Sequence, residues 1–184
     1  MFFSRRLVLV EGVEDVAYIT SYIQLMDRYD DFRRSGYHIV PVGGKSELIK
    51  PLAIAKLLDI EVFVVCDADT DKTEDSEVGK HKKDNAAILH LLGHGKDENW
   101  PDYVIKKPNL RMWQTNITKT IGPELGEQWK QHVDQAAAYY GNAGGLNKNP
   151  LAVSRALESA WNSGLKSEAL QDLVNDMLST KSGS

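Results

Sequence analysis

Two stretches, RLVLVEG at residues 6–12 and EVFVVCDAD at residues 61–69, decide the fold. Each is a short, nearly continuous apolar run that ends in acidic residues. Apolar runs of this length and density are typical of parallel strands that are buried on both faces of a sheet. The stretch 37–42, which Gly43 and Gly44 close, is a third candidate strand. The sequence therefore predicts buried strands with carboxylates at their carboxyl ends.

Segments with helical spacing lie between the strands, at residues 15–28 and 45–58. Strands that alternate with helices indicate a parallel sheet with helical crossovers. We expect an α/β fold, a parallel sheet flanked by helices, followed by a C-terminal helical extension. The remaining predictions are a polar loop at 70–83, a short helix at 85–92, a peripheral strand at 102–106, a helical region at 115–140 with a break near Gly122-Pro123, a Gly/Asn-rich loop at 141–150, and helices at 150–162 and 167–178.

The composition fits one or two folded domains. The chain has 184 residues, of which 42% are hydrophobic and 26% charged, which excludes a wholly disordered protein. No run of 18 apolar residues occurs, and the single cysteine, Cys66, excludes an intrachain disulfide. We expect a cytoplasmic protein without membrane contact. The net charge of −4 offers no argument for nucleic acid binding by bulk charge.

Four carboxylates follow the first and third strands. Glu11 comes directly after the first strand, Asp15 follows it by four residues, and Asp67 and Asp69 come after the third strand. Ligands of open parallel sheets bind outside the carboxyl ends of the strands, where all four would project. Crowded carboxylates repel one another, and hard divalent cations with oxygen ligands remove that conflict. The competing interpretation is that these residues only form turns and cap helices.

Two short motifs suggest other chemistries and fit them poorly. Gly43-Gly44-Lys45-Ser46 is similar to the end of a phosphate loop, but the first glycine of that pattern would fall on Ile39. A shorter Gly-rich turn at a helix start can still bring backbone N–H groups near a metal site or a phosphate, and a plain tight turn into a helix explains the motif equally well. Asp67-Ala-Asp69-Thr70 resembles a phosphohydrolase signature with an aspartate nucleophile. That signature requires Thr or Val where this chain has Asp71, and it normally follows the first strand.

The acidic residues together resemble those of a Toprim domain, the catalytic module of topoisomerases, DnaG-type primases and several nucleases. Toprim domains carry one Glu after the first strand and an Asp-x-Asp after a later strand, and here Glu11 and Asp67 stand 56 residues apart. This resemblance covers about the first 100 residues. It implies a Toprim catalytic domain at residues 1–108. The change to mostly helical sequence after about residue 109 predicts a helical extension at 109–178, and we expect a disordered tail at 179–184.

Finer features resemble the nucleases of the OLD (overcoming lysogenization defect) family. These are the second carboxylate in Glu11-Gly-Val-Glu-Asp15, the Gly-Gly-Lys-Ser turn and the helical extension. The family pairs an N-terminal ABC-type ATPase with a C-terminal Toprim nuclease that cuts DNA with two divalent metals. The chain starts near the first Toprim strand and has no ATP-binding signature, so it resembles the C-terminal region of such a protein. Asp15 departs from the pattern, because many members have Glu there.

The resemblance implies a DNA endonuclease with two Mg²⁺ or Mn²⁺ ions, which Ca²⁺ can replace in binding, and with the two ions clamping the attacking and leaving oxygens. The predicted metal ligands are Glu11, Asp15, Asp67, Asp69 and Asp71, and the predicted catalytic residues are Glu11 and Lys148. The resemblance implies a basic residue near the metals in the helical extension, and Lys148, in a loop at a helix start, is our candidate for it. The alternative is that Lys148 is an ordinary solvated loop lysine. Candidate contacts to the DNA backbone are Lys80, Lys82, Lys83, Lys106, Lys107 and Arg111.

Two alternatives remain open at this point. One is another Toprim chemistry, strand passage or priming, which would need further domains or a catalytic tyrosine. The other is a non-catalytic module that binds nucleic acid or a protein partner through a degenerate acidic site.

Overall fold

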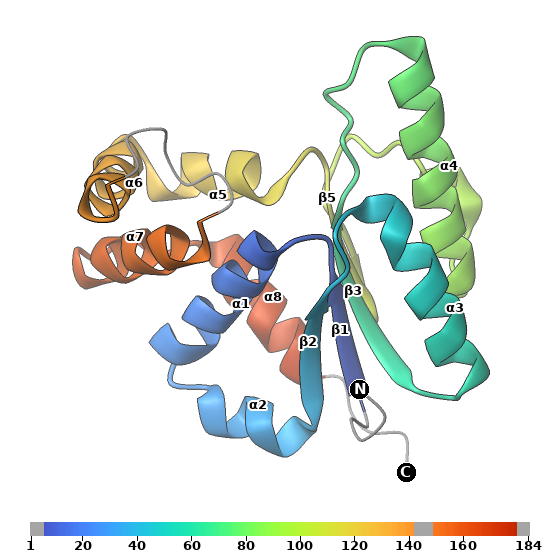
Figure 1. Ribbon diagram of the computed structural model, residues 1–184, viewed down its shortest axis with the longest axis horizontal. Helices are drawn as coiled ribbons and strands as arrows, with labels where there is room; N and C mark the ends of the chain where they lie inside the picture. The colour runs from blue at the N-terminus through green and yellow to red at the C-terminus, as the bar shows by residue number, and fades with distance from the viewer. Residues whose placement is uncertain (1–5, 142–148, 180–184) are drawn as a thin grey trace.

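The computed structural model describes residues 6–141 and 149–179 as a three-layer α/β/α arrangement (Figure 1). The strand order in the five-stranded sheet is β2-β1-β3-β5-β4. The strands are β1 (Arg6–Val10), β2 (Tyr37–Pro41), β3 (Glu61–Asp67), β4 (Ile105–Lys107) and β5 (Leu110–Trp113). Only β4 runs antiparallel to its neighbour among these pairs. The predicted parallel sheet with flanking helices is confirmed.

Alternate side chains of the strands enter two separate cores. Val8, Phe63 and Trp113 face α1 (Val13–Leu25), α5 (Ile117–Leu125), α6 (Gln128–Tyr139), α7 (Pro150–Asn162) and α8 (Glu168–Ser179). Leu9 and Val64 face α3 (Ile49–Leu57) and α4 (Asp75–Leu91) on the other side of the sheet. Because both faces are covered, the strands carry apolar residues at nearly every position. The helical extension therefore supplies most of one covering layer, together with α1 (Figure 1).

Several segments differ from the sequence predictions. The predicted loop at 70–83 is wrong, because α4 begins at Asp75 and continues through the predicted short helix to Leu91. The helix α2 (Tyr29–Ser35) and the 3₁₀ turn η2 (Lys96–Glu98) were not predicted. The predicted helix at 45–58 begins as the 3₁₀ turn η1 (Lys45–Leu48) and continues as α3. The break in the helical region lies at Gly126, whose φ is 70°, because α5 continues past Pro123.

The two predicted boundaries, at residue 108 and at residue 179, lie next to β5 and at the end of α8. Strand β5 pairs with β3 although it lies beyond residue 108, so the sheet extends into the predicted helical extension. Ser179, the first residue of the predicted tail, is the last residue of α8, and residues 180–184 lie outside the described part of the chain. The division at residue 108 stays a prediction. In the part of the chain that the structure describes, no helix is long and apolar enough to cross a bilayer.

Candidate metal centre

The carboxyl ends of β1 and β3 bring Glu11 and Asp67 into direct contact. Their strands pair in parallel with Val10 opposite Val65, so both chains leave the sheet at the same edge. The Oε1 atom of Glu11 accepts a hydrogen bond of 2.8 Å from the backbone N–H of Asp67. Glu11 and Asp67, 56 positions apart in the sequence, are therefore held together by the register of the two strands and by the hydrogen bond to the Glu11 side chain.

Asp15 joins these carboxylates from the first turn of α1. Its Oδ2 atom accepts a hydrogen bond of 2.9 Å from the N–H of Gly12, the residue that precedes the helix. The capping role that was the competing interpretation is therefore present. It does not remove Asp15 from the cluster, because Glu11, Asp15 and Asp67 all line one cleft of about 1220 Å³. The walls of this cleft come from α1, the turn after β2, and the helices α5, α6 and α7.

Electrostatics show that the cluster is short of positive charge. Burial raises the pKa of Asp67 to about 9, and the carboxylates of Glu11, Asp15 and Asp69 add to the rise. Burial raises the pKa of Glu11 to about 7, while the Asp67 N–H and the Lys45 ammonium group oppose the rise. Burial also raises the pKa of Asp15 to about 6, with a contribution from the neighbouring Glu14. Three carboxyl groups that resist ionisation together are suited to a divalent cation.

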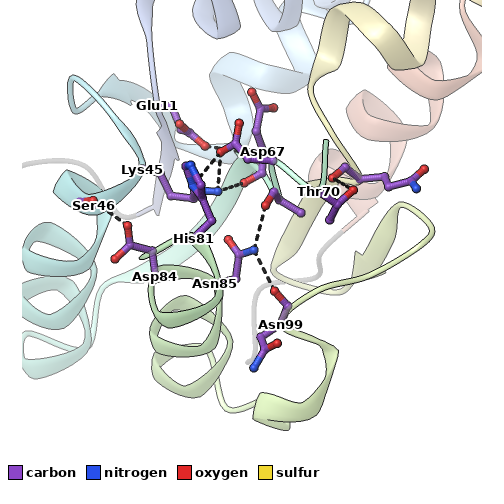
Figure 2. Close-up of polar contacts among 12 residues, drawn as sticks. Glu11, Lys45, Ser46, Asp67, Thr70, His81, Asp84, Asn85 and Asn99 are labelled. Atoms are coloured by element: carbon purple, nitrogen blue, oxygen red, sulfur yellow. Dashed lines mark hydrogen bonds and ion pairs between the residues drawn. The ribbon is translucent and has the colours of Figure 1, made fainter. Parts of the chain in front are cut away.

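Asp69 and Asp71 are turned toward other partners. A salt bridge of 2.6 Å joins the Asp69 carboxylate to the Lys45 Nζ atom, and His81 lies 3.2 Å from the same oxygen (Figure 2). Asp71 forms a salt bridge with Lys119 on α5, and this hydrogen bond lowers the pKa of Asp71. Neither residue lines the cleft that holds the other three carboxylates.

The carboxylate oxygens of the cluster are suitable ligands for a divalent ion, but they are not arranged at ligand distances from one common point. Carboxylate oxygens are the ligands that Mg²⁺ and Mn²⁺ prefer. Among the described residues, no group of three or more acidic, histidine or cysteine side chains is already gathered in a ligand cage. Asp15 and Asp69 each hold a hydrogen bond or ion pair that an ion would replace or share. The fit rests on the chemistry of the donors and on their raised pKa values.

The turn between β3 and α4 is fixed at its backbone. The N–H groups of Ala68, Asp69 and Thr70 donate to backbone carbonyls at or just after the end of β5. The side chain of Asn85 on α4 donates to the carbonyls of Ala68 and Asn99 (Figure 2). These bonds explain how a short acidic turn keeps its shape between two layers of the fold.

The remaining predicted residues have different outcomes. Lys148 lies outside the described residues, and its role stays a prediction. Arg111 is fully buried and forms an ion pair with Asp176 on α8, so it cannot reach a DNA backbone. Lys106 pairs with Asp172 and Lys107 with Glu98, whereas Lys80, Lys82 and Lys83 lie exposed on α4. Cys66 is buried in β3, and burial raises the pKa of its thiol, which argues against a nucleophile.

Sequence reasoning missed Lys45 and His81 as parts of this site. From the sequence, the Gly-Gly-Lys-Ser turn is interpreted as an incomplete phosphate loop and as a feature of the OLD resemblance, and the lysine itself has no predicted role. Its position after the strand next to β1 was the available signal, because that end of β2 lies at the same edge of the sheet as Glu11 and Asp67.

Comparison with known proteins finds a family match for the first part of the chain. Residues 2–69 match the family described as overcoming lysogenization defect protein-like, TOPRIM domain. These residues belong to the OLD-like Toprim family. The matched part of the Toprim domain includes Glu11, Asp15, Asp67 and Asp69. None of the curated protein sequences matches the chain.

Solved structures extend the likeness of fold beyond the matched residues. The C-terminal region of the Burkholderia pseudomallei OLD protein superposes with a TM-score of 0.61 at 16% identity, covering 97% of this chain and 100% of that one. The C-terminal region of the Xanthomonas campestris pv. campestris OLD protein has a TM-score of 0.60 at 12% identity, covering 97% and 96%. The helices after the Toprim domain thus share the fold of these OLD C-terminal regions, and the predicted fold class is confirmed.

Proposed function

We propose that this chain is a divalent-metal-dependent DNA endonuclease domain. The observation that carries the proposal is the convergence of Glu11, Asp15 and Asp67 in one cleft, each with a raised pKa. Ion pairs that only stabilise a fold would hold these carboxylates charged. An assembly of carboxyl groups that costs stability is typical of a functional site.

Glu11, Asp15 and Asp67 would hold a first Mg²⁺ or Mn²⁺ ion, and Asp67 with Asp69 a second. Bound ions would supply electrophilic stabilisation of a phosphodiester and a nucleophile from water at neutral pH. The chain's own residues position that chemistry. The Asp67 N–H orients Glu11 through its Oε1 atom, and the backbone bonds of the β3–α4 turn orient Asp67. Asp71 is a weaker candidate ligand, since Lys119 already neutralises it.

The DNA would lie along the cleft with its backbone near exposed lysines. Lys130 on α6 lines the cleft itself, and Lys80 and Lys83 are exposed on α4 beyond the acidic turn. Lys148, just before α7, is proposed to offset charge on the phosphate in the transition state. We also propose that the chain acts as the C-terminal part of a larger protein with an N-terminal ABC-type ATPase, as the likeness to OLD C-terminal regions suggests.

Incubation with supercoiled and linear DNA across Mg²⁺, Mn²⁺, Ca²⁺ and a chelator tests this proposal. We expect nicked or linear products with Mg²⁺ or Mn²⁺ and none with excess chelator. Relaxed, religated circles would instead indicate strand passage. DNA binding without any cleavage in all four conditions would indicate a non-catalytic module.

A further inference from the structure

Lys45 is a buried lysine with two well-defined partners. Its side chain is 4% exposed, and its Nζ atom lies 2.7 Å from the backbone oxygen of Asp67 and 2.6 Å from Oδ2 of Asp69 (Figure 2). Lysine is almost never buried unless its charge is paired. The ammonium group is therefore an internal cation of the acidic turn, and it lies between the two aspartates of Asp67-Ala-Asp69.

The backbone places Lys45 at this position. Gly43 and Gly44 have φ values of 91° and 135°, which residues other than glycine rarely adopt. Their backbone N–H groups donate to the Glu11 carbonyl at 2.8 and 2.9 Å. On the other side, the hydroxyl of Ser46 donates to Asp84 on α4 at 2.6 Å. The turn is thus tied to the end of β1 and to α4, so the position of the ammonium group is a property of the fold.

Asp69 is held apart from the other carboxylates by this lysine. Its backbone has a φ of 56°, and its N–H donates to the Thr115 carbonyl at 3.2 Å. Its carboxylate faces Lys45 and His81, while Asp67 lines the cleft with Glu11. Two aspartates that are separated by one residue therefore have different surroundings, because the Asp69 carboxylate pairs with the Lys45 ammonium group while Asp67 faces the cleft.

We propose that Lys45 is a positioning residue that controls a second divalent ion by competing with it for Asp69. This inference rests on the proposed metal site. An ion that binds Oδ2 of Asp69 must displace the ammonium group, since two cations within a few ångströms repel each other strongly in a buried site. Lys45 stabilises the acidic turn while the ion is absent, and it weakens the binding of the second ion relative to the first.

Mn²⁺ titration followed by electron paramagnetic resonance tests the competition without relying on activity. Lys45→Met should tighten the second Mn²⁺ binding step by about tenfold or more, because a charge-assisted hydrogen bond no longer has to be broken. Lys50→Met is the matched control, since Lys50 is exposed on α3, and it should bind Mn²⁺ as the wild type does. In an Asp69→Asn background the effect of Lys45→Met on this step should vanish.

Thermal melting in excess chelator gives a second readout. Lys45→Met should melt below the wild type there, because Asp69 loses its principal partner. If that variant fails to fold, Lys45→Gln carries the same expectation for Mn²⁺, since it keeps a donor for the Asp67 carbonyl without the charge. An unchanged second step, or equal tightening in the Asp69→Asn background, would overturn the inference.

Failure of this inference and failure of the proposed function give different results. A wild type that binds Mn²⁺ and a Lys45→Met variant that binds it identically would reject the competition and leave the nuclease proposal standing. A wild type that cuts no DNA, combined with a Lys45→Met variant that gains a second Mn²⁺, would reject the nuclease and support the competition. If neither protein binds Mn²⁺, both proposals are wrong.

Discussion

Asp67→Asn should stabilise the protein when divalent ions are absent and abolish most of the stabilisation that such ions give. The folded-state pKa of Asp67 is about 9, against an ordinary value of 3.8. The folded protein therefore binds this proton more tightly than the unfolded chain does. The stability that this bound proton gives to the folded state is lost as the pH rises from the ordinary pKa of 3.8 toward the folded-state pKa of about 9.

The magnitude follows from that difference. At pH 7 the folded state keeps a proton that the unfolded chain has released, which costs about 1.36 kcal/mol for each of roughly three pH units, or about 4 kcal/mol. An amide at this position needs no proton, but it still has to be desolvated, so only part of this cost is recovered. For a chain of this size, 1 kcal/mol corresponds to a shift of about 2–4 °C, and we expect the melting temperature to rise by at least about 5 °C.

Melting curves in excess chelator from pH 5 to pH 8.5 measure the effect. The gap between the variant and the wild type should widen as the pH rises, and it should reverse when Mn²⁺ is added. Asp71→Asn is the matched control, because the pKa of Asp71 is lowered by its hydrogen bond to Lys119, and it should bring no gain. If Asp67→Asn melted at or below the wild-type temperature at pH 8 in chelator, the conclusion that the buried Asp67 carboxyl group destabilises the metal-free protein would be wrong.

Three further predictions follow from the same account. Lys148→Ala should lower kcat while DNA and metal affinities stay nearly unchanged, whereas a weaker affinity with a smaller salt dependence would reduce Lys148 to a phosphate contact. ATP should not stimulate DNA cleavage by this chain when the free metal concentration is held constant, and clear stimulation would show that the absence of an ATP-binding signature was misread. Asp176→Asn should lower the free energy of unfolding by about 1–3 kcal/mol in urea titrations, because it leaves the buried guanidinium of Arg111 without its ion pair; an unchanged midpoint would contradict that role.

The sequence was sufficient to predict the central strands and the acidic edge, because local pattern encodes both. The segments 6–10 and 61–66 are almost wholly apolar, as buried parallel strands must be, and their acidic residues follow directly. The parallel pairing of β1 with β3 then brings Glu11 beside Asp67. The general rule that the carboxyl ends of parallel strands meet at one edge of the sheet supplied the rest of this prediction.

Elements that depend on distant partners could not be predicted in this way. Helix α4 has 17 residues of which only Asn85, Ile88 and Leu89 are buried, so its first half lacks the apolar period of a helix. Strand β5 contains Arg111, whose burial is possible only because Asp176 lies across from it on α8. Lys45 is a similar case, because its role depends on Asp69, 24 positions further along the chain.

We propose above all that the Glu11, Asp15 and Asp67 cluster binds divalent ions to cut DNA. The most direct test is the initial rate of plasmid nicking in Mn²⁺ by the wild type and by Asp67→Asn, with Asp102→Asn, at an exposed position outside the cluster, as a folded control. We predict that Asp67→Asn loses about a hundredfold in rate, equivalent to about 2.7 kcal/mol of transition-state stabilisation, while Asp102→Asn stays within a few-fold of the wild type. Nicking by Asp67→Asn at the wild-type rate, or wild-type nicking that persists in excess chelator, would contradict the claim.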